Sequence, residues 1–240
     1  MADINILIGS GETKRLKTAG KYCKTDIVVT AGEGASKPNP QGIYQRLSYI
    51  TGDGKTYFNT GYKANNSTGI ELTASYTKQA DSITCGSRAD SGNTRFVPPY
   101  LLSSSSLYFG FNNGTSISYS NKTGTKYLSC LNFLNSRCAS LKTSESSGVA
   151  VSSIAGRTLT TQTSSIAIFT FTQGSDSTIG SIHNYTLYRC RISQGSEIVR
   201  DYVPCYRISD GEVGLYDMIN GEFLTKKGTG TFTVGTNVDW

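Results

Sequence analysis

The sequence has few charged residues, a single histidine and no long apolar run. Of its 240 residues, only 17% are Asp, Glu, Lys or Arg, and the formal net charge of +6 is spread along the chain. Proteins that bind nucleic acid usually concentrate their basic residues on one face or arm, so this pattern argues against a nucleic-acid partner. No stretch approaches the roughly 18–20 apolar residues that span a bilayer, and we therefore expect no membrane insertion.

The opening residues, MADINILIGSG, also lack the pattern of a secretory signal. Asp3 stands where a basic region should be, and the apolar run is broken after Ile8. The sequence therefore predicts a protein that is made in the cytoplasm, or that leaves the cell by a route the sequence does not show.

The cysteines form no metal-binding pattern. All six are widely spaced, with no CxxC motif and only His183 to join them: Cys23, Cys85, Cys130, Cys138, Cys190 and Cys205. A structural zinc site needs about four N or S ligands at close spacing, and no D-x-D-x-D loop suggests calcium. We expect no metal and no cofactor. Without a secretory signal, free buried thiols are favoured over disulfides.

The composition changes along the chain and divides it into two parts. Residues 1–33 read as a small β element with a turn at Ala19-Gly20. About 30 residues are too few to hold a core alone, so this element is expected to pack on another protein. Residues 34–42 hold Pro38 and Pro40, which restrict the backbone and predict a semi-rigid linker. Residues 43–240 are long enough for one domain.

The second part alternates polar and apolar residues with a period of two, the pattern of half-buried strands. In residues 70–77 (IELTASYT) the apolar side chains occupy every second position, and residues 182–190 alternate in the same way. The nearly continuous apolar run SSIAIFTFTQ (164–173) predicts a central strand, and Asn113-Gly114 predicts a hairpin turn. Abundant Ser, Thr and Gly disfavour helices. We predict an all-β, two-sheet antiparallel sandwich.

The stretch RDYVPCYRISDGEVGLYDMINGEFLTKKGTGTF (200–232) gathers many charged residues and could be read as a reaction centre. Asp-Gly at 210–211 and Asn-Gly at 220–221 instead predict two hairpin turns, and Pro204 marks an edge or the end of a ladder. Glycoside hydrolysis needs two carboxyl groups held roughly 5–9.5 Å apart across a sugar ring. We interpret the four candidate carboxylates as structural: Asp201, Asp210, Glu212 and Asp217.

Four stretches carry a resemblance to a known family. They are YITGDGKTYFNTGY (49–62), CGSR (85–88), YRCRISQGSEIVRDYVPCYRISDGEVGLYDMINGEF (188–223) and GTGTFTVG (228–235). Together they resemble the concanavalin A-like (LamG-type) jelly-roll domains of bacteriophage and prophage virion proteins. LKTAGKYCKTDIVVT (16–30) is similar to short β repeats in tail, fibre and accessory proteins of phages that infect gut Firmicutes.

The resemblance implies a virion protein of the tail, the fibre or the capsid decoration that displays a lectin-like jelly roll in residues 43–240. Residues 1–33 would attach it to other virion proteins, as a homo-oligomer or in many copies on the particle. A host-cell or mucosal glycan is the second expected partner. The family's motif positions imply framework residues and no active site: Gly61, Asp201, Pro204, Gly214, Tyr216, Asp217 and Gly221.

Two alternatives stay open, because one architecture hosts many functions. The domain could be a dedicated receptor-binding lectin, or it could be a glycosidase. Glucanases of this architecture resemble one another through an E-x-D-x-E strand, which this chain lacks. A serine hydrolase would need His183 as its base, and the chain has no G-x-S-x-G motif. We expect that the protein is not an enzyme.

A glycan site would need exposed aromatic faces for sugar C–H groups and polar side chains for hydroxyl groups. The richest stretch is RFVPPYLLSSSSLYFGFNNGTSISYS (95–120). Its candidate carbohydrate-binding residues are Arg95, Tyr100, Asn112, Asn113 and Tyr119. The alternative is that the tyrosines pack on the sandwich and the asparagines form a turn. Trp240 is interpreted as a packing residue at the chain end.

Overall fold

The computed structural model describes residues 40–75, 85–89, 95–97 and 159–240 with their side chains, and elsewhere only the backbone of the strands named below. The chain divides into two compact units, Met1–Asn39 and Pro40–Trp240. All regular elements in the described part are strands.

The first unit contains a three-stranded sheet. Strand β1 (Asp3–Leu7) pairs antiparallel with β2 (Thr13–Lys17) and parallel with β3 (Val28–Val29). The turn expected at Ala19-Gly20 lies outside the described residues.

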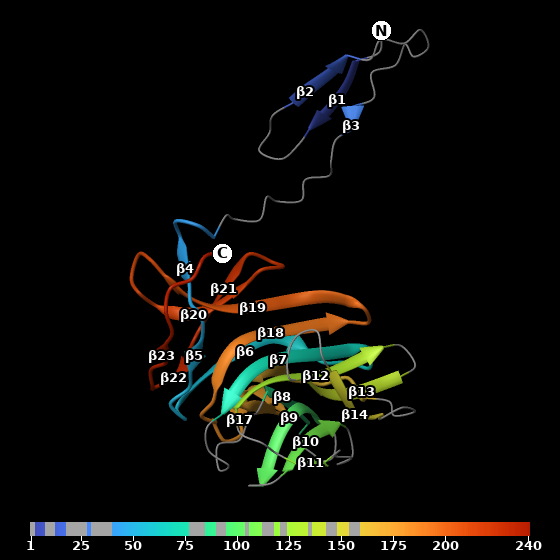
Figure 1. The fold of residues 1–240 in the computed structure, drawn as a ribbon, viewed down its shortest axis with the longest axis vertical. Helices are drawn as coiled ribbons and strands as arrows, with labels where there is room; N and C mark the ends of the chain where they lie inside the picture. The colour runs from blue at the N-terminus through green and yellow to red at the C-terminus, as the bar shows by residue number, and fades with distance from the viewer. Residues whose placement is uncertain are drawn as a thin grey trace. The chain divides into compact units, whose positions relative to one another are not determined.

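The second unit consists of two large, mainly antiparallel sheets (Figure 1). The nine-stranded sheet runs in the order β11 (Ser118–Ser120), β10 (Ser106–Phe111), β9 (Arg95–Ser103), β8 (Cys85–Arg88), β15 (Ser165–Ile168), β6 (Thr56–Lys63) and β22 (Lys227–Gly228), with β16 (Phe171–Gln173) and β17 (Ser175–Ile179) beside this path.

The eleven-stranded sheet runs in the order β14 (Gly148–Ser153), β13 (Ser136–Lys142), β12 (Gly124–Phe133), β7 (Thr68–Tyr76), β18 (Thr186–Gln194), β19 (Glu197–Arg207), β20 (Val213–Asp217) and β21 (Glu222–Thr225). Beside this path, β4 (Tyr44–Arg46) pairs with β19, and β5 (Ile50–Thr51) pairs with β18 and β23 (Thr233–Val234). The architecture is consistent with the predicted β sandwich.

Both sheets contribute to one hydrophobic core. Phe58 of β6 and Ile168 of β15 come from the first sheet, while Leu72 of β7 and Leu187 of β18 come from the second, and all four are almost completely buried. Burial of such apolar side chains drives folding at roughly 25 cal/mol per Å². In β7 the alternation follows the prediction for the described residues, since Ile70, Leu72 and Ala74 are buried and the residues between them are half-exposed.

In β18 the predicted alternation holds as far as Leu187 and then breaks. The strand begins at Thr186 and a register irregularity lies between Leu187 and Arg189. One extra residue in β18 at this irregularity moves the inward-facing side chains by one position. After Leu187 the core therefore receives Cys190 and Ile192, and not Arg189 and Arg191. His183 precedes the strand and is not mid-strand as the sequence suggested.

The apolar run 164–173 is not the single strand that the sequence predicted. Strand β15 pairs antiparallel with β8, whereas β16 pairs parallel with it, so the chain reverses between them. The reversal uses Phe169, whose φ of 73° is rare for a residue with a side chain. Its N–H donates to Tyr185 Oη (3.1 Å), its carbonyl accepts the His183 N–H (2.7 Å), and its ring stacks on Tyr185 at 4.3 Å. These contacts hold a conformation that an apolar pattern cannot reveal.

The cysteine prediction is confirmed where the structure describes the thiols. Cys85, Cys190 and Cys205 are free and buried. Burial raises the pKa of the Cys205 thiol to about 12. The side chains of the other three cysteines lie outside the described residues.

The two ends of the second unit lie against each other. Leu47 bridges Asn237, and the Val238 N–H donates to the carbonyl of Arg46 (3.1 Å). Trp240 donates its indole N–H to the carbonyl of Tyr44 and packs edge-on against the ring of Tyr216. These contacts confirm its interpretation as a packing residue. Figure 1 shows β4 and the C-terminus at one end of this unit, with β8 to β11 toward the other.

Candidate functional site

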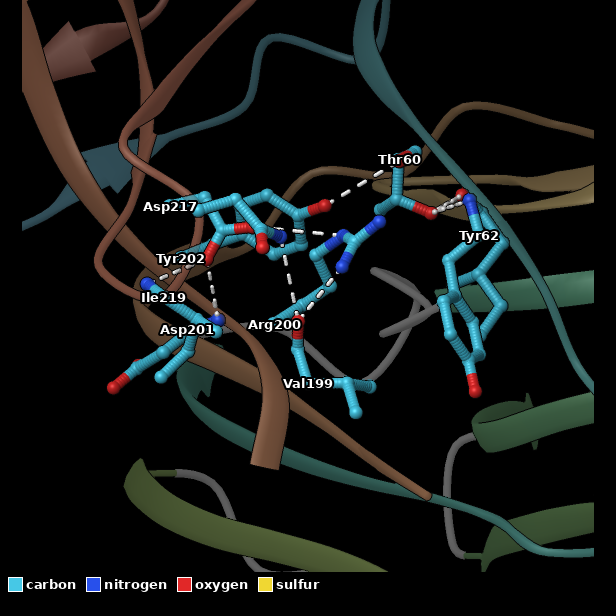
Figure 2. Close-up of polar contacts among 10 residues, drawn as sticks. Thr60, Tyr62, Val199, Arg200, Asp201, Tyr202, Asp217 and Ile219 are labelled. Carbon is cyan, nitrogen blue, oxygen red and sulfur yellow. Dashed lines mark hydrogen bonds and ion pairs between the residues drawn. The ribbon is translucent and has the colours of Figure 1, made fainter. Parts of the chain in front are cut away.

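The acidic residues of the closing stretch were the first candidates for chemistry, and Asp217 is the most buried of them. It lies at the end of β20 with no exposed surface. Its Oδ1 accepts the backbone N–H groups of Asp201 (3.0 Å) and Ile219 (2.9 Å), and its Oδ2 accepts Asn220 Nδ2 at 2.8 Å. Figure 2 shows this carboxylate between the two backbone donors, with Arg200 Nε at 3.5 Å. The side chain thus closes the β20–β21 turn onto β19.

Asp201 is fixed by arginines of the neighbouring strand. Arg189 of β18 donates Nε and Nη2 to its two carboxylate oxygens at 2.7 and 2.5 Å, the paired geometry that gives the strongest ion pairs. Arg191 Nε lies 3.7 Å from Asp201 Oδ1, and Arg191 Nη1 donates to Glu71 Oε2 of β7 at 3.5 Å. This chain of charges joins β7, β18 and β19 across the sheet.

Asp210 and Glu212 lie in the turn between β19 and β20. Arg207 binds both oxygens of Asp210, and this hydrogen bonding is the main cause that lowers the pKa of the carboxyl. Asp210 Oδ1 also accepts the Glu212 N–H (3.1 Å), which shapes the turn around Gly211. All of these contacts support the framework interpretation of the acidic residues.

The strongest candidate for binding lies in the other sheet, where β8, β9 and β16 meet. A pocket there is lined by Arg88 of β8, Arg95 and Val97 of β9, and Phe171 of β16. Arg88 and Arg95 are directly opposite in the antiparallel β8–β9 pair. Both are half-buried, and the Nε atom of each is buried without a hydrogen-bond partner among the described residues.

Strand alternation explains why the arginines share one face. Phe96, between Arg95 and Val97, is buried in the core, and it pairs with Ser87, which is also buried. Arg88, Arg95 and Val97 therefore lie on the opposite face of the sheet.

Two glycines make room beside them. A Cβ on Gly86 would lie 2.1 Å from the Phe96 carbonyl oxygen, and its φ of +153° is one that side chains rarely adopt. A Cβ on Gly180 would lie 2.3 Å from the Phe171 ring, so this glycine allows the ring to take its place at the pocket.

The pocket has the chemistry of an anion site with an apolar wall. Guanidinium groups bind carboxylates or sulfates through parallel N–H donors. Like charges that face each other across a strand pair are destabilising, so the two arginines together cost stability unless an anion joins them. Phe171, which is only partly buried, offers the apolar surface that sugar C–H groups require, and the buried Val97 lines the pocket wall.

Of the residues predicted to bind carbohydrate, only Arg95 can be placed in the pocket. Tyr100 lies in β9 and Tyr119 in β11, but their side chains are outside the described part, and Asn112 and Asn113 are outside it altogether.

Sequence reasoning missed Arg88, Val97 and Phe171. A cross-strand register between β8 and β9 would have revealed the first, and Ser91-Gly92 between these strands is the turn signal that could have suggested it. Phe171 was assigned to a continuous central strand, and only the reversal at Phe169 brings it to β8.

Other kinds of site have less support. Within the described residues, no three His, Cys, Asp or Glu side chains come together in a way that could hold a metal ion. The same part of the chain contains no helix of the length and apolar character needed to cross a membrane.

Comparison of the sequence with protein-family models finds no matching family, and comparison with curated proteins finds no match.

Proposed function

We propose that the protein is a non-enzymatic bacteriophage virion component of the tail, fibre or capsid decoration. Its second unit would be a concanavalin A-like jelly roll that adheres to host or mucosal glycans, and the first unit would attach it to other virion proteins in several copies. The sequence resemblance suggested this function, and the two-sheet fold with a core shared by both sheets is compatible with it.

The observation that carries the proposal is the contrast between the two charged regions. The carboxylates of Asp201 and Asp217 accept hydrogen bonds from arginines and backbone N–H groups of the framework. Arg88 and Arg95, in contrast, line a pocket beside an aromatic ring and have no such partners among the described residues. A binding domain needs this combination of a rigid framework and a separate polar and apolar recess.

The pocket also favours the more specialised alternative, a dedicated receptor-binding lectin. The two functions share the same fold and attachment, and they differ in whether glycan recognition is the main task. A dedicated receptor-binding lectin binds one glycan far more tightly than similar glycans, whereas a decorating adhesin binds a range of glycans.

The full-length protein on a glycan array tests the proposal, together with a hydrolysis assay on a broad polysaccharide panel. We expect retention of glycans without release of reducing ends. Sustained turnover would contradict the non-enzymatic function, and absence of binding to every glycan would contradict adhesion.

A further inference from the structure

We propose that the pocket between β8, β9 and β16 binds the anionic group of an acidic sugar, with Arg88 and Arg95 holding a carboxylate or sulfate and Phe171 contacting the sugar ring. This inference rests on the proposed glycan adhesion and assigns it a ligand class.

The other arginines in the described part of the chain have an acceptor for their guanidinium groups. Arg189, Arg191, Arg200 and Arg207 each have a carboxylate within 4 Å, and Arg46 donates Nη1 to the carbonyl of Asp239. Among the described residues no carboxylate contacts Arg88 or Arg95, although their Nε atoms are buried. A buried guanidinium donor without an acceptor is costly, and this cost disappears when a ligand supplies the oxygen atoms.

The geometry of the strand pair suits one anion shared by both side chains. Arg88 and Arg95 occupy a directly opposed position of the β8–β9 ladder, which brings residues on one face to about 4.5–5.5 Å between Cβ atoms. Two guanidinium groups that start so close can converge on one carboxylate or sulfate. An anion between them also removes their mutual repulsion, so ligand binding and strand pairing support each other.

The apolar side of the pocket selects for a sugar over a bare ion. Phe171 is only partly buried, and Gly180 holds no side chain that could push its ring away. Val97 of β9 lines the pocket wall but is almost completely buried. An acidic sugar presents an anionic group at one edge and C–H groups on its ring face, which matches arginines at one side and an aromatic ring at the other.

The test is a calorimetric titration of the full-length protein with four oligosaccharides of equal length: oligogalacturonate, its methyl ester, a neutral galactan and a sulfated galactan. We expect binding of oligogalacturonate or of the sulfated galactan, weakened by salt, and no measurable binding of the ester and the neutral oligomer. A comparison of the affinity for oligogalacturonate with the affinity for the sulfated galactan shows whether the pocket prefers a carboxylate or a sulfate.

Arg88→Gln and Arg95→Gln should each weaken binding by about tenfold or more, because a charged hydrogen bond is lost. Arg95→Lys should also weaken it, since lysine keeps the charge but not the paired donors. Arg207→Gln, at the end of β19 in the other sheet, is the matched control and should bind like the wild type. The glutamine variants should melt at the same temperature as the wild type or higher, which separates lost binding from unfolding.

Two results overturn the inference in different ways. Binding of the neutral galactan that survives in Arg88→Gln and Arg95→Gln leaves glycan adhesion intact but refutes the acidic-sugar pocket. Absence of binding to all four oligomers and to every member of the array refutes the proposed adhesion as well. Equal binding of poly-glutamate would show a general anion patch and also refute a sugar site.

Discussion

Removing the Asp217 carboxylate should destabilise the second unit strongly, and the structure allows the cost to be worked out. Asp217→Ala deletes the acceptor for the N–H groups of Asp201 and Ile219 and for Asn220 Nδ2, and it leaves Arg200 without its anion. Each unsatisfied buried donor costs about 1–3 kcal/mol. Because part of this site can admit water, we expect a total of about 3–5 kcal/mol, the range for breaking a buried charged pair.

Asp217→Asn should cost less. The amide oxygen can still accept the two backbone N–H groups, but the amide nitrogen then faces Asn220 Nδ2 and Arg200 Nε, which are both donors. We expect a loss of about 1–2 kcal/mol, close to one or two ordinary hydrogen bonds. No activity should be lost with either variant, since the carboxylate has a structural role.

Urea unfolding provides the assay. The protein has one tryptophan, Trp240, whose ring lies edge-on to Tyr216 at 5.3 Å, so its fluorescence reports on this region. Far-UV circular dichroism should give a coincident transition if unfolding is two-state. Asp210→Ala is the control, because that carboxylate is exposed in its turn and should matter much less. A cost below about 1 kcal/mol for Asp217→Ala would refute the reasoning.

Three further predictions follow from other parts of the chain. Gly221→Val should cost about 1–3 kcal/mol in urea unfolding, because the φ of +73° at this turn strains a β-branched residue; an unchanged midpoint would contradict it. The folded pKa of Cys205, about 12, lies above the unfolded value of 9.0, so its contribution is present below pH 9 and lost as pH rises toward 12. Between pH 9 and 12 the free energy of unfolding of Cys205→Ala should therefore fall less steeply than that of the wild type, by about 1.4 kcal/mol per pH unit. Parallel curves of unfolding free energy against pH for the two proteins would argue against this prediction. Deleting residues 1–33 should leave the remainder soluble and folded by circular dichroism but absent from purified particles, and normal occupancy of particles would show that attachment lies elsewhere.

The turns of the closing stretch could be predicted because their signals are local. Gly211 and Gly221 have φ of +71° and +73°, as the Asp-Gly and Asn-Gly pairs required, and VGLYD forms β20 between them. Tyr216 is buried as expected, and Phe223 packs on the same aromatic cluster. Pro204 lies between the end of the β18 ladder at Tyr202 and the start of the β4 ladder at Cys205, as the end-of-ladder prediction required. On the other side of β19 it pairs with Leu215 in the middle of the β20 ladder, so the prediction holds for one side of the strand only.

The features that failed depend on contacts far apart in sequence. The reversal at Phe169 is held by Tyr185 and the backbone of His183, which no window around residue 169 contains. The Arg88–Arg95 pair requires the register of two strands, and period-two alternation gives a face without giving a partner. Arg95 could therefore be named as a candidate, whereas its opposite residue could not.

The meeting of the two ends of the second unit has a mechanical consequence. Because the segments around Leu47 and Trp240 are bonded to each other, the first and last residues of the second unit lie at the same end of it. Chain termini that lie this close tolerate insertion of the whole unit into a loop of another protein. A fusion partner placed after Trp240 would lie at the end of the unit that holds β4, away from β8 and β9. Under the proposed function, several copies on one particle would each bind weakly, and these contacts would add up to firm attachment through multivalency.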